Sequence, residues 1–203
     1  MEATLQFFIV LPNLTFLTSL LVSRKKESIL SGLAIASVGL QLLGTIAFIP
    51  WWLVNHYPTL DVKSIVLYQR PHFEFFIDFY FDKTTAVFAF MGAILTFLVV
   101  IFSRYYMHRE EGFKRFFTTL LAFFVGYNLI VFSGNFETLF VGWGILGITS
   151  FLLIAFYRDR YLPVKNGFKV LSFYRLGDIC LILAMWMSHH LWHKNITFFE
   201  WNQ

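Results

Sequence analysis

The sequence predicts an all-α integral membrane protein with about six transmembrane helices and one short β-hairpin outside the membrane. Of its 203 residues, 58% are hydrophobic and 14% are charged, whereas average soluble domains have about 45–50% apolar and about 25% charged residues. Aromatic residues make up 21% of the chain, which suits lipid-facing surfaces and interfacial belts. The basic residues lie mostly in short loops between apolar runs. This pattern is typical of membrane topology and argues against a soluble enzyme, a disordered protein or a nucleic-acid binder.

The apolar runs define the expected helices, since a transmembrane helix needs about 20 mostly apolar residues. The six runs are residues 4–22, 29–54, 84–103, 116–133, 136–157 and 167–188. Between the second and third runs, residues 62–68 and 73–81 are rich in β-branched and aromatic side chains, with a plausible turn at 69–72. This composition favours an extracytoplasmic β-hairpin that lies on the bilayer face. An irregular interfacial loop is the alternative.

The distribution of Lys and Arg predicts the orientation of the chain. Eleven fall after the first, third and fifth runs, counting the start of the sixth, and four fall in the other loops. The positive-inside rule places the eleven in the cytoplasm. The loops that hold Arg109 and Arg160 are then cytoplasmic, and both termini are extracytoplasmic.

The sixth run contains an ionisable pair, Arg175 and Asp178, which are three residues apart and share one helix face. Each charge costs about 2.5–3.5 kcal/mol at the centre of a transmembrane helix, so this helix should face protein or water. Two interpretations follow from the residues alone. The pair is either a proton- or ion-handling site or a structural ion pair that fixes helix packing.

Other polar residues favour structural roles. Lys169 near the cytoplasmic start of the sixth run is expected to snorkel to the interface. Glu137 and Asp82 stand at the starts of the fifth and third runs, where a carboxylate suits a helix N-terminus. Gln41 and Asn128 are expected to be interhelical hydrogen-bond partners.

The fifth run contains the small-residue segment GWGILG at 142–147. Gly144 and Gly147 are three residues apart and share a helix face, and small residues let helices approach closely. We therefore expect this segment to pack against a neighbouring helix.

No metal, cofactor or catalytic residue is expected. His189 and His193 are one helical turn apart, and His190 lies between them, but no further ligand with suitable spacing stands out. Interfacial histidines are the preferred interpretation. The single cysteine, Cys180, excludes a cysteine-built metal site or an iron–sulfur cluster. The chain also has no phosphate-binding loop, nucleophile elbow or dinucleotide fingerprint.

Four motifs resemble one known family when they are read in order. They are FYFDKTT at 79–85, SRYYMHREEGFKRFF at 103–117, NFETLFVGWGILGITSFLLIAFY at 135–157 and RLGD at 175–178. They are similar to the third-helix start, a Tyr-Met…Arg-Phe-Phe loop, the fifth-helix signature and the Arg-x-Gly-Asp motif of antiporter-like proton-translocating membrane subunits. This family includes complex I subunit L, the Mrp antiporter A subunit and the membrane subunit of Dab-type inorganic-carbon uptake complexes. The resemblance covers roughly residues 75–187.

The resemblance implies a function and an environment. Family members conduct protons through buried charged residues, so Arg175 and Asp178 would belong to a charge network, which we extend to Lys169 and Glu137. The chain would be a proton-pumping subunit of an NADH-quinone oxidoreductase that has no redox centre of its own. It would lie in the bacterial inner membrane, with the lipid bilayer and other membrane subunits as its partners.

The resemblance also implies a division of the chain, which is a single membrane domain over residues 1–203. Residues 1–54 would form two peripheral helices, 55–81 the hairpin segment, 82–188 helices three to six at the start of the antiporter-like domain, and 189–203 a tail.

Two departures from the family pattern define the alternatives. The family has a glutamate in the Gly-Trp-Glu motif of its fifth helix, where this chain has Gly144. The lysine-bearing seventh helix and the second repeat of the family are absent from these residues, so we expect a fragment, a truncated gene product or a split subunit completed by another chain. The alternatives are the membrane partner of an inorganic-carbon uptake complex, an Mrp-type antiporter subunit, and a structural membrane subunit that conducts nothing.

Overall fold

The computed structural model describes residues 2–23, 26–56, 58–70, 73–192 and 197–198. Its elements, in chain order, are α1 (Glu2–Leu21), α2 (Glu27–Val54), β1 (Leu60–Arg70), β2 (Phe73–Phe81), α3 (Lys83–Tyr106), α4 (Phe113–Val131), α5 (Phe136–Ile154) and α6 (Tyr161–Trp192). In this part of the chain, six helices are long and apolar enough to cross a membrane. The predicted fold class is therefore confirmed.

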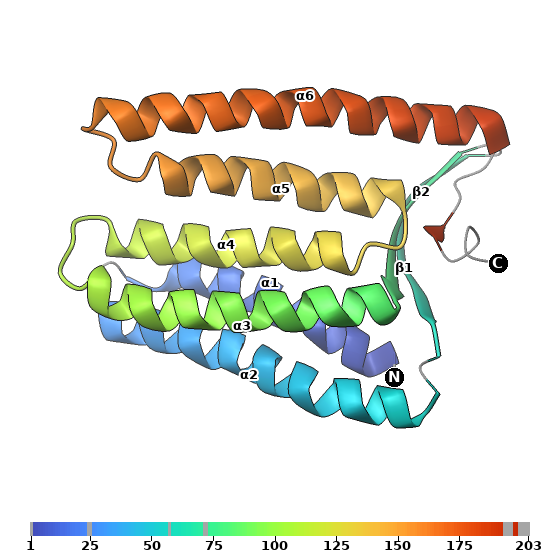
Figure 1. Cartoon of the computed structure of the whole chain (residues 1–203), viewed down its shortest axis with the longest axis horizontal. Helices are drawn as coiled ribbons and strands as arrows, with labels where there is room; N and C mark the ends of the chain where they lie inside the picture. The colour runs from blue at the N-terminus through green and yellow to red at the C-terminus, as the bar shows by residue number, and fades with distance from the viewer. Residues whose placement is uncertain (1, 24–25, 57, 71–72, 193–196, 199–203) are drawn as a thin grey trace.

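The helices run alternately in opposite directions, roughly side by side (Figure 1). The α1–α2, α3–α4 and α5–α6 connections lie at one end, and the hairpin, the start of α1 and the end of α6 lie at the other. The three connections, which together with the adjoining helix turns hold eleven Lys and Arg residues in the sequence, therefore lie at the same end, which we call the basic end. The positive-inside count requires these three connections to lie on one side of the membrane, and this arrangement meets that requirement.

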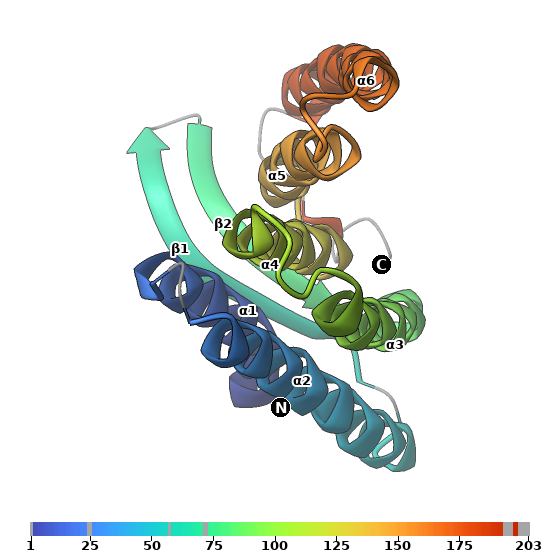
Figure 2. The same ribbon diagram turned by 90° about the vertical axis from the view of Figure 1, so that its left-hand side faces the viewer.

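The helices form a bundle with α6 at its edge. Viewed along the helices, α4, α5 and α6 follow one another outward from α1, α2 and α3 (Figure 2). α6 packs mainly against α5, and only 6% of the residues in its apolar span are buried. Most of the α6 surface is thus available to lipid or to another protein.

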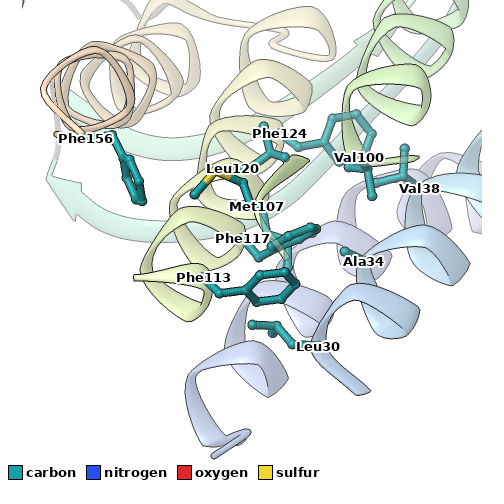
Figure 3. Close-up of a cluster of buried hydrophobic side chains, with 11 residues drawn as sticks. Leu30, Ala34, Val38, Val100, Met107, Phe113, Phe117, Leu120, Phe124 and Phe156 are labelled. Atoms are coloured by element: carbon teal, nitrogen blue, oxygen red, sulfur yellow. The ribbon is translucent and has the colours of Figure 1, made fainter. Parts of the chain in front are cut away.

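Two apolar clusters hold the bundle together. Near the basic end, Phe113 and Phe117 of α4 reach toward Leu30 and Ala34 of α2 (Figure 3). At the hairpin end, an aromatic cluster joins α1, α2, β2 and the end of α4. Its members include Phe8, Phe48, Trp52, Phe81 and Phe132. The aromatic residues that are abundant in the sequence therefore serve as core as well as lipid-facing surface.

The predicted hairpin is confirmed between α2 and α3. Its strands pair antiparallel from Leu60 opposite Phe81 to Arg70 opposite Phe73. The loop between α4 and α5 extends this pairing, since the Tyr80 backbone N–H donates to the Phe132 carbonyl at 2.9 Å. The hairpin is therefore tied to the helix bundle through its second strand.

The helix boundaries follow local chemistry. The Asp82 carboxylate accepts a 2.7 Å hydrogen bond from the Thr85 backbone N–H and caps α3, which confirms its predicted role. α6 begins at Tyr161, six residues before its apolar run begins. Pro163 is compatible with this start, because proline is tolerated in the first turn of a helix. The predicted apolar run is thus only the central part of this helix.

Candidate functional site

Arg175 and Asp178 form an ion pair on α6. The Arg175 Nη1 donates to the Asp178 Oδ2 at 2.6 Å, so the predicted pairing is confirmed. The two side chains differ in exposure, at 55% for Arg175 and 12% for Asp178. The carboxylate is thus enclosed by protein, whereas the guanidinium lies at the surface of the described chain.

Close packing of α5 against α6 encloses the Asp178 carboxylate. A Cβ atom placed on Gly147 would lie 3.1 Å from the Tyr174 ring, and one on Gly177 would lie 3.1 Å from the Trp143 ring. The Trp143 and Tyr174 rings themselves contact each other, with their centroids 5.2 Å apart. The Tyr174 ring of α6 therefore packs on Gly147 of α5, and the Trp143 ring of α5 packs on Gly177 of α6, the residue before Asp178.

Gly144 does not take part in this packing. A Cβ atom placed there would meet nothing within 4 Å, although Gly147, three residues later, is in tight contact. The expected packing of the glycine segment is therefore confirmed at Gly147 and wrong at Gly144. The α5 surface at Gly144 has room for a side chain.

The Trp143 indole adds a polar group to the same region. Its Nε1 is buried and has no hydrogen-bond partner among the residues that the structure describes. An indole N–H is a donor only, and leaving a buried donor unpaired costs about 1–3 kcal/mol. Together with Asp178, it makes this part of the α5–α6 seam more polar than the apolar pattern of the two helices suggests.

Glu137 lies at the hairpin end of α5, far from the ion pair. It is 5% exposed and interacts electrostatically with His189 near the end of α6. His189 follows Asp178 by about three helical turns and so lies on the same side of α6. One side of α6 therefore carries Asp178 in the middle and His189 at the end, next to Glu137.

Lys169 is not part of this arrangement. It precedes Asp178 by about two and a half turns, which places it on the opposite side of α6, and its side chain is exposed. The structure thus brings together Arg175 with Asp178 and Glu137 with His189, but it does not bring Lys169 to either pair.

The histidines do not form a metal site in the part of the chain that the structure describes, where no group of three potential ligands occurs. The His190 ring stacks on Trp186, with centroids 5.4 Å apart and an interplanar angle of 8°. His193 lies outside the described residues, so the predicted spacing of His189 and His193 stays a prediction.

The interhelical hydrogen bond that the sequence suggested is present. The Gln41 Nε2 donates to the Asn128 Oδ1 at 2.5 Å, and both residues are almost fully buried. This bond joins α2 to α4 within the bundle. The interpretation of Gln41 and Asn128 as structural partners is confirmed.

Sequence reasoning missed one buried carboxylate, Asp78 of β2, which is 1% exposed. Its backbone N–H donates to the Thr138 Oγ1 at 3.1 Å, and its backbone carbonyl accepts from the Gly134 N–H at 2.8 Å. Its alternation with Phe76 and Tyr80, which are also buried, could have placed Asp78 on the inward face of the strand. The neighbouring Phe79 and Phe81 are buried as well, so the sequence does not distinguish an inward face from an outward one.

Comparisons with known proteins agree with this architecture. A family described as "NADH-Ubiquinone oxidoreductase (complex I), chain 5 N-terminus" matches residues 69–117. A second family, described as "NADH:quinone oxidoreductase/Mrp antiporter, TM", matches residues 133–200. Together the two matches cover more than half of the chain.

Individual relatives give the same result. The NADH-ubiquinone oxidoreductase chain 5 of Hippopotamus amphibius is 26% identical over 192 residues, which cover 93% of this chain and 31% of the relative. The NADH-quinone oxidoreductase subunit L of Buchnera aphidicola is 36% identical over 93 residues, which cover 46% of this chain and 15% of that subunit. The matches thus span about a third or less of these relatives.

A solved structure shows the same fold. A subunit chain of the membrane-bound sulfane sulfur reductase, an archaeal respiratory membrane complex, superposes with a TM-score of 0.72 at 19% identity, over 92% of this chain and 37% of that chain. The fold and the matches define a multi-pass antiporter-like membrane subunit. The chain belongs to the family of antiporter-like subunits that includes complex I chain 5 and subunit L.

Proposed function

We propose that this chain is the N-terminal part of a proton-translocating antiporter-like subunit of an NADH-quinone oxidoreductase. The observation that carries the proposal is the Arg175–Asp178 ion pair in the middle of a membrane-spanning helix. Charged groups inside a span are costly, and they mark ion and proton pathways in membrane proteins. Asp178 is enclosed at the α5–α6 seam, where a carboxyl group could exchange protons with neighbouring groups.

The orientation follows from the basic end. The three connections there and the helix turns next to them hold eleven Lys and Arg residues in the sequence, and the positive-inside rule assigns such segments to the cytoplasm. Both termini and the hairpin are then extracytoplasmic, and the membrane is the bacterial inner membrane.

The partners are further membrane helices. The relatives extend well beyond the matched region, and α6, which carries the ion pair, is the least covered helix of the bundle. Arg175 is half exposed on it. Helices that correspond to the rest of the relatives, on this polypeptide or on a second chain, would cover this side of α6 and supply partners for Arg175.

Gly144 favours a second candidate function. In the family pattern this position is a glutamate, and glycine cannot carry a proton. A subunit without this group would hold neighbouring subunits in place and conduct nothing. The ion pair on α6 argues against this candidate, because a purely structural helix gains little from a half-exposed charge pair.

A flux measurement separates the two candidates. The chain is purified with the membrane partners that it retains and is reconstituted into vesicles, where a potassium gradient with valinomycin supplies the driving potential. A proton-translocating subunit gives proton uptake above that of vesicles that contain the partners alone. Uptake equal to that of the partners alone would favour the structural subunit.

A further inference from the structure

The basic end holds a cavity that proton translocation does not use. It has a volume of about 390 Å³ and lies where α4 begins, α5 ends and α6 begins. Its polar lining consists of Arg115, Thr119 and Arg158, and its apolar lining includes Phe151 and Val164. Arg115 lies in the first turn of α4 and Arg158 in the α5–α6 loop, and Phe151 lies about one turn deeper along α5 than Ala155.

Arg115 is held in place by the end of α5. Its Nη2 donates to the Phe156 carbonyl at 3.1 Å, and its guanidinium carbon lies 4.9 Å from the centre of the Phe156 ring. Gly112 leaves the room for this contact, because a Cβ atom there would lie 3.3 Å from both the Arg115 Nη2 and the Phe156 ring. Gly112 also has a φ of 98°, which favours glycine. One guanidinium of the cavity is therefore preorganised.

The cavity is lined by positive charges, whereas the space next to it is lined mostly by negative ones. Among the described residues, its charged lining consists of Arg115 and Arg158 alone. A larger adjoining cavity of about 990 Å³ shares both arginines, and its other charged lining consists of Glu27, Glu110, Glu111, Asp159 and Lys114. The Lys114 Nζ donates to the Leu20 carbonyl at 2.8 Å, so the carboxylates outnumber the one further cation. A ligand that fits both cavities carries an anion between the arginines, a cation beside the carboxylates and an apolar tail along α5.

We propose that this site binds a phospholipid with an ammonium headgroup, phosphatidylethanolamine. Arginine and a hydroxyl group are well suited to the phosphate oxygens, and basic pockets between membrane helices bind lipid headgroups. The ammonium group reaches the carboxylates of the adjoining cavity, and an acyl chain follows Phe151 and Val164 into the membrane. A second phosphate at the ammonium position would meet four carboxylates and one lysine, which disfavours lipids with more than one phosphate.

The test is lipid binding by native mass spectrometry of the detergent-solubilised chain. Phosphatidylethanolamine, phosphatidylglycerol and phosphatidylcholine with identical acyl chains are titrated separately. We expect phosphatidylethanolamine to bind most tightly of the three lipids. Arg158→Gln is expected to weaken phosphatidylethanolamine binding by about tenfold, because it removes one charge-assisted hydrogen bond. Arg160→Gln removes the same charge two residues away, outside both cavities, and leaves binding unchanged.

Further variants test the headgroup and the acyl chain. Asp159→Asn combined with Glu110→Gln removes the preference for phosphatidylethanolamine over phosphatidylglycerol. Val164→Trp fills the apolar part and weakens lipid binding, whereas inorganic phosphate does not compete with the lipid in the wild-type chain. Tighter binding of phosphatidylglycerol, equal effects of Arg158→Gln and Arg160→Gln, or full competition by inorganic phosphate would overturn the proposal.

Discussion

The Arg175 guanidinium and the Asp178 carboxylate are 2.6 Å apart, but only the carboxylate is enclosed by the bundle. The pair therefore joins a buried anion to a cation at the α6 surface. Removing one partner of such a pair does not have the same consequence as removing the other, because the cost of a lost ion pair comes mostly from the charge left behind without water.

Arg175→Gln is therefore expected to lower stability more than Asp178→Asn. The first variant leaves an enclosed carboxylate without its cation, at a cost of about 3–5 kcal/mol. The second leaves a guanidinium on the α6 surface, and its long side chain lowers the cost by reaching toward the membrane interface. Thermal unfolding of the purified chain in detergent, followed by circular dichroism, measures both, with Arg160→Gln as the control. Equal losses for the two variants would show that Asp178 is not enclosed as described.

Gly92 allows α3 and α4 to approach each other. A Cβ atom there would overlap the Tyr127 ring, and the Tyr127 hydroxyl donates to the Phe88 carbonyl of α3 at 2.7 Å. We expect Gly92→Ala to destabilise the chain by about 1–3 kcal/mol through overpacking. Gly32→Ala is the matched control, because a Cβ atom there meets nothing within 4 Å and alanine favours helix by about 0.5–1 kcal/mol. If both variants had the same melting temperature, the α3–α4 contact would be wrong.

The topology is tested by cysteine labelling of intact cells, in a Cys180→Ser background. Arg160→Cys at the basic end is expected to react with an impermeant maleimide only after permeabilisation. Asp61→Cys on β1 is exposed at the other end and is expected to react in intact cells. Labelling of the first site and protection of the second would reverse the orientation.

Position 144 is expected to accept a carboxylate, whereas position 142 is not. A Cβ atom at Gly142 would lie 2.9 Å from the Ile130 backbone nitrogen of α4, and one at Gly144 meets nothing within 4 Å. Gly144→Glu should therefore fold and insert like the wild type, and Gly142→Glu should lower the yield of folded protein in size-exclusion chromatography. A similar loss for both variants would mean that the α5 surface at Gly144 is covered.

The same variant has a functional consequence. In the chain alone, a glutamate at position 144 has no basic partner, so it takes up a proton and gives no flux in vesicles. In a form completed by the family's lysine-bearing helix, Gly144→Glu should raise proton flux. Equal flux from the chain alone and from the completed Gly144→Glu variant would make this position unimportant.

Much of the fold follows from local sequence patterns. The apolar runs predicted the six spans, the Asp82 carboxylate predicted a helix start, and the polar residues Gln41 and Asn128 predicted an interhelical bond, because a buried amide needs a partner. These features depend on one segment or one pair of residues. The length of α6 was underestimated, since hydropathy does not register a helix that continues beyond its apolar run.

The site depends on tertiary contacts that a sequence pattern does not contain. Gly144 and Gly147 share a helix face by spacing, but only Gly147 meets a ring of α6, because the α6 side chains that pack along α5 do not reach Gly144. The burial of Asp78 depends on the α4–α5 loop, which is distant in sequence. The cavity at the basic end likewise needs two segments about 40 residues apart to meet, the first turn of α4 at Arg115 and the chain just after α5 at Phe156.

The most direct test of the account is proton flux through vesicles that contain the chain and its membrane partners, with Asp178→Asn compared with Asp61→Asn. The two substitutions remove the same charge with nearly the same shape, one within α6 and one on the exposed hairpin strand. The account predicts that Asp178→Asn lowers flux by at least about tenfold, as expected for the loss of a proton-transferring group, while Asp61→Asn retains wild-type flux. Flux through Asp178→Asn equal to that of the wild type would contradict the account and leave the Arg175–Asp178 pair a structural contact.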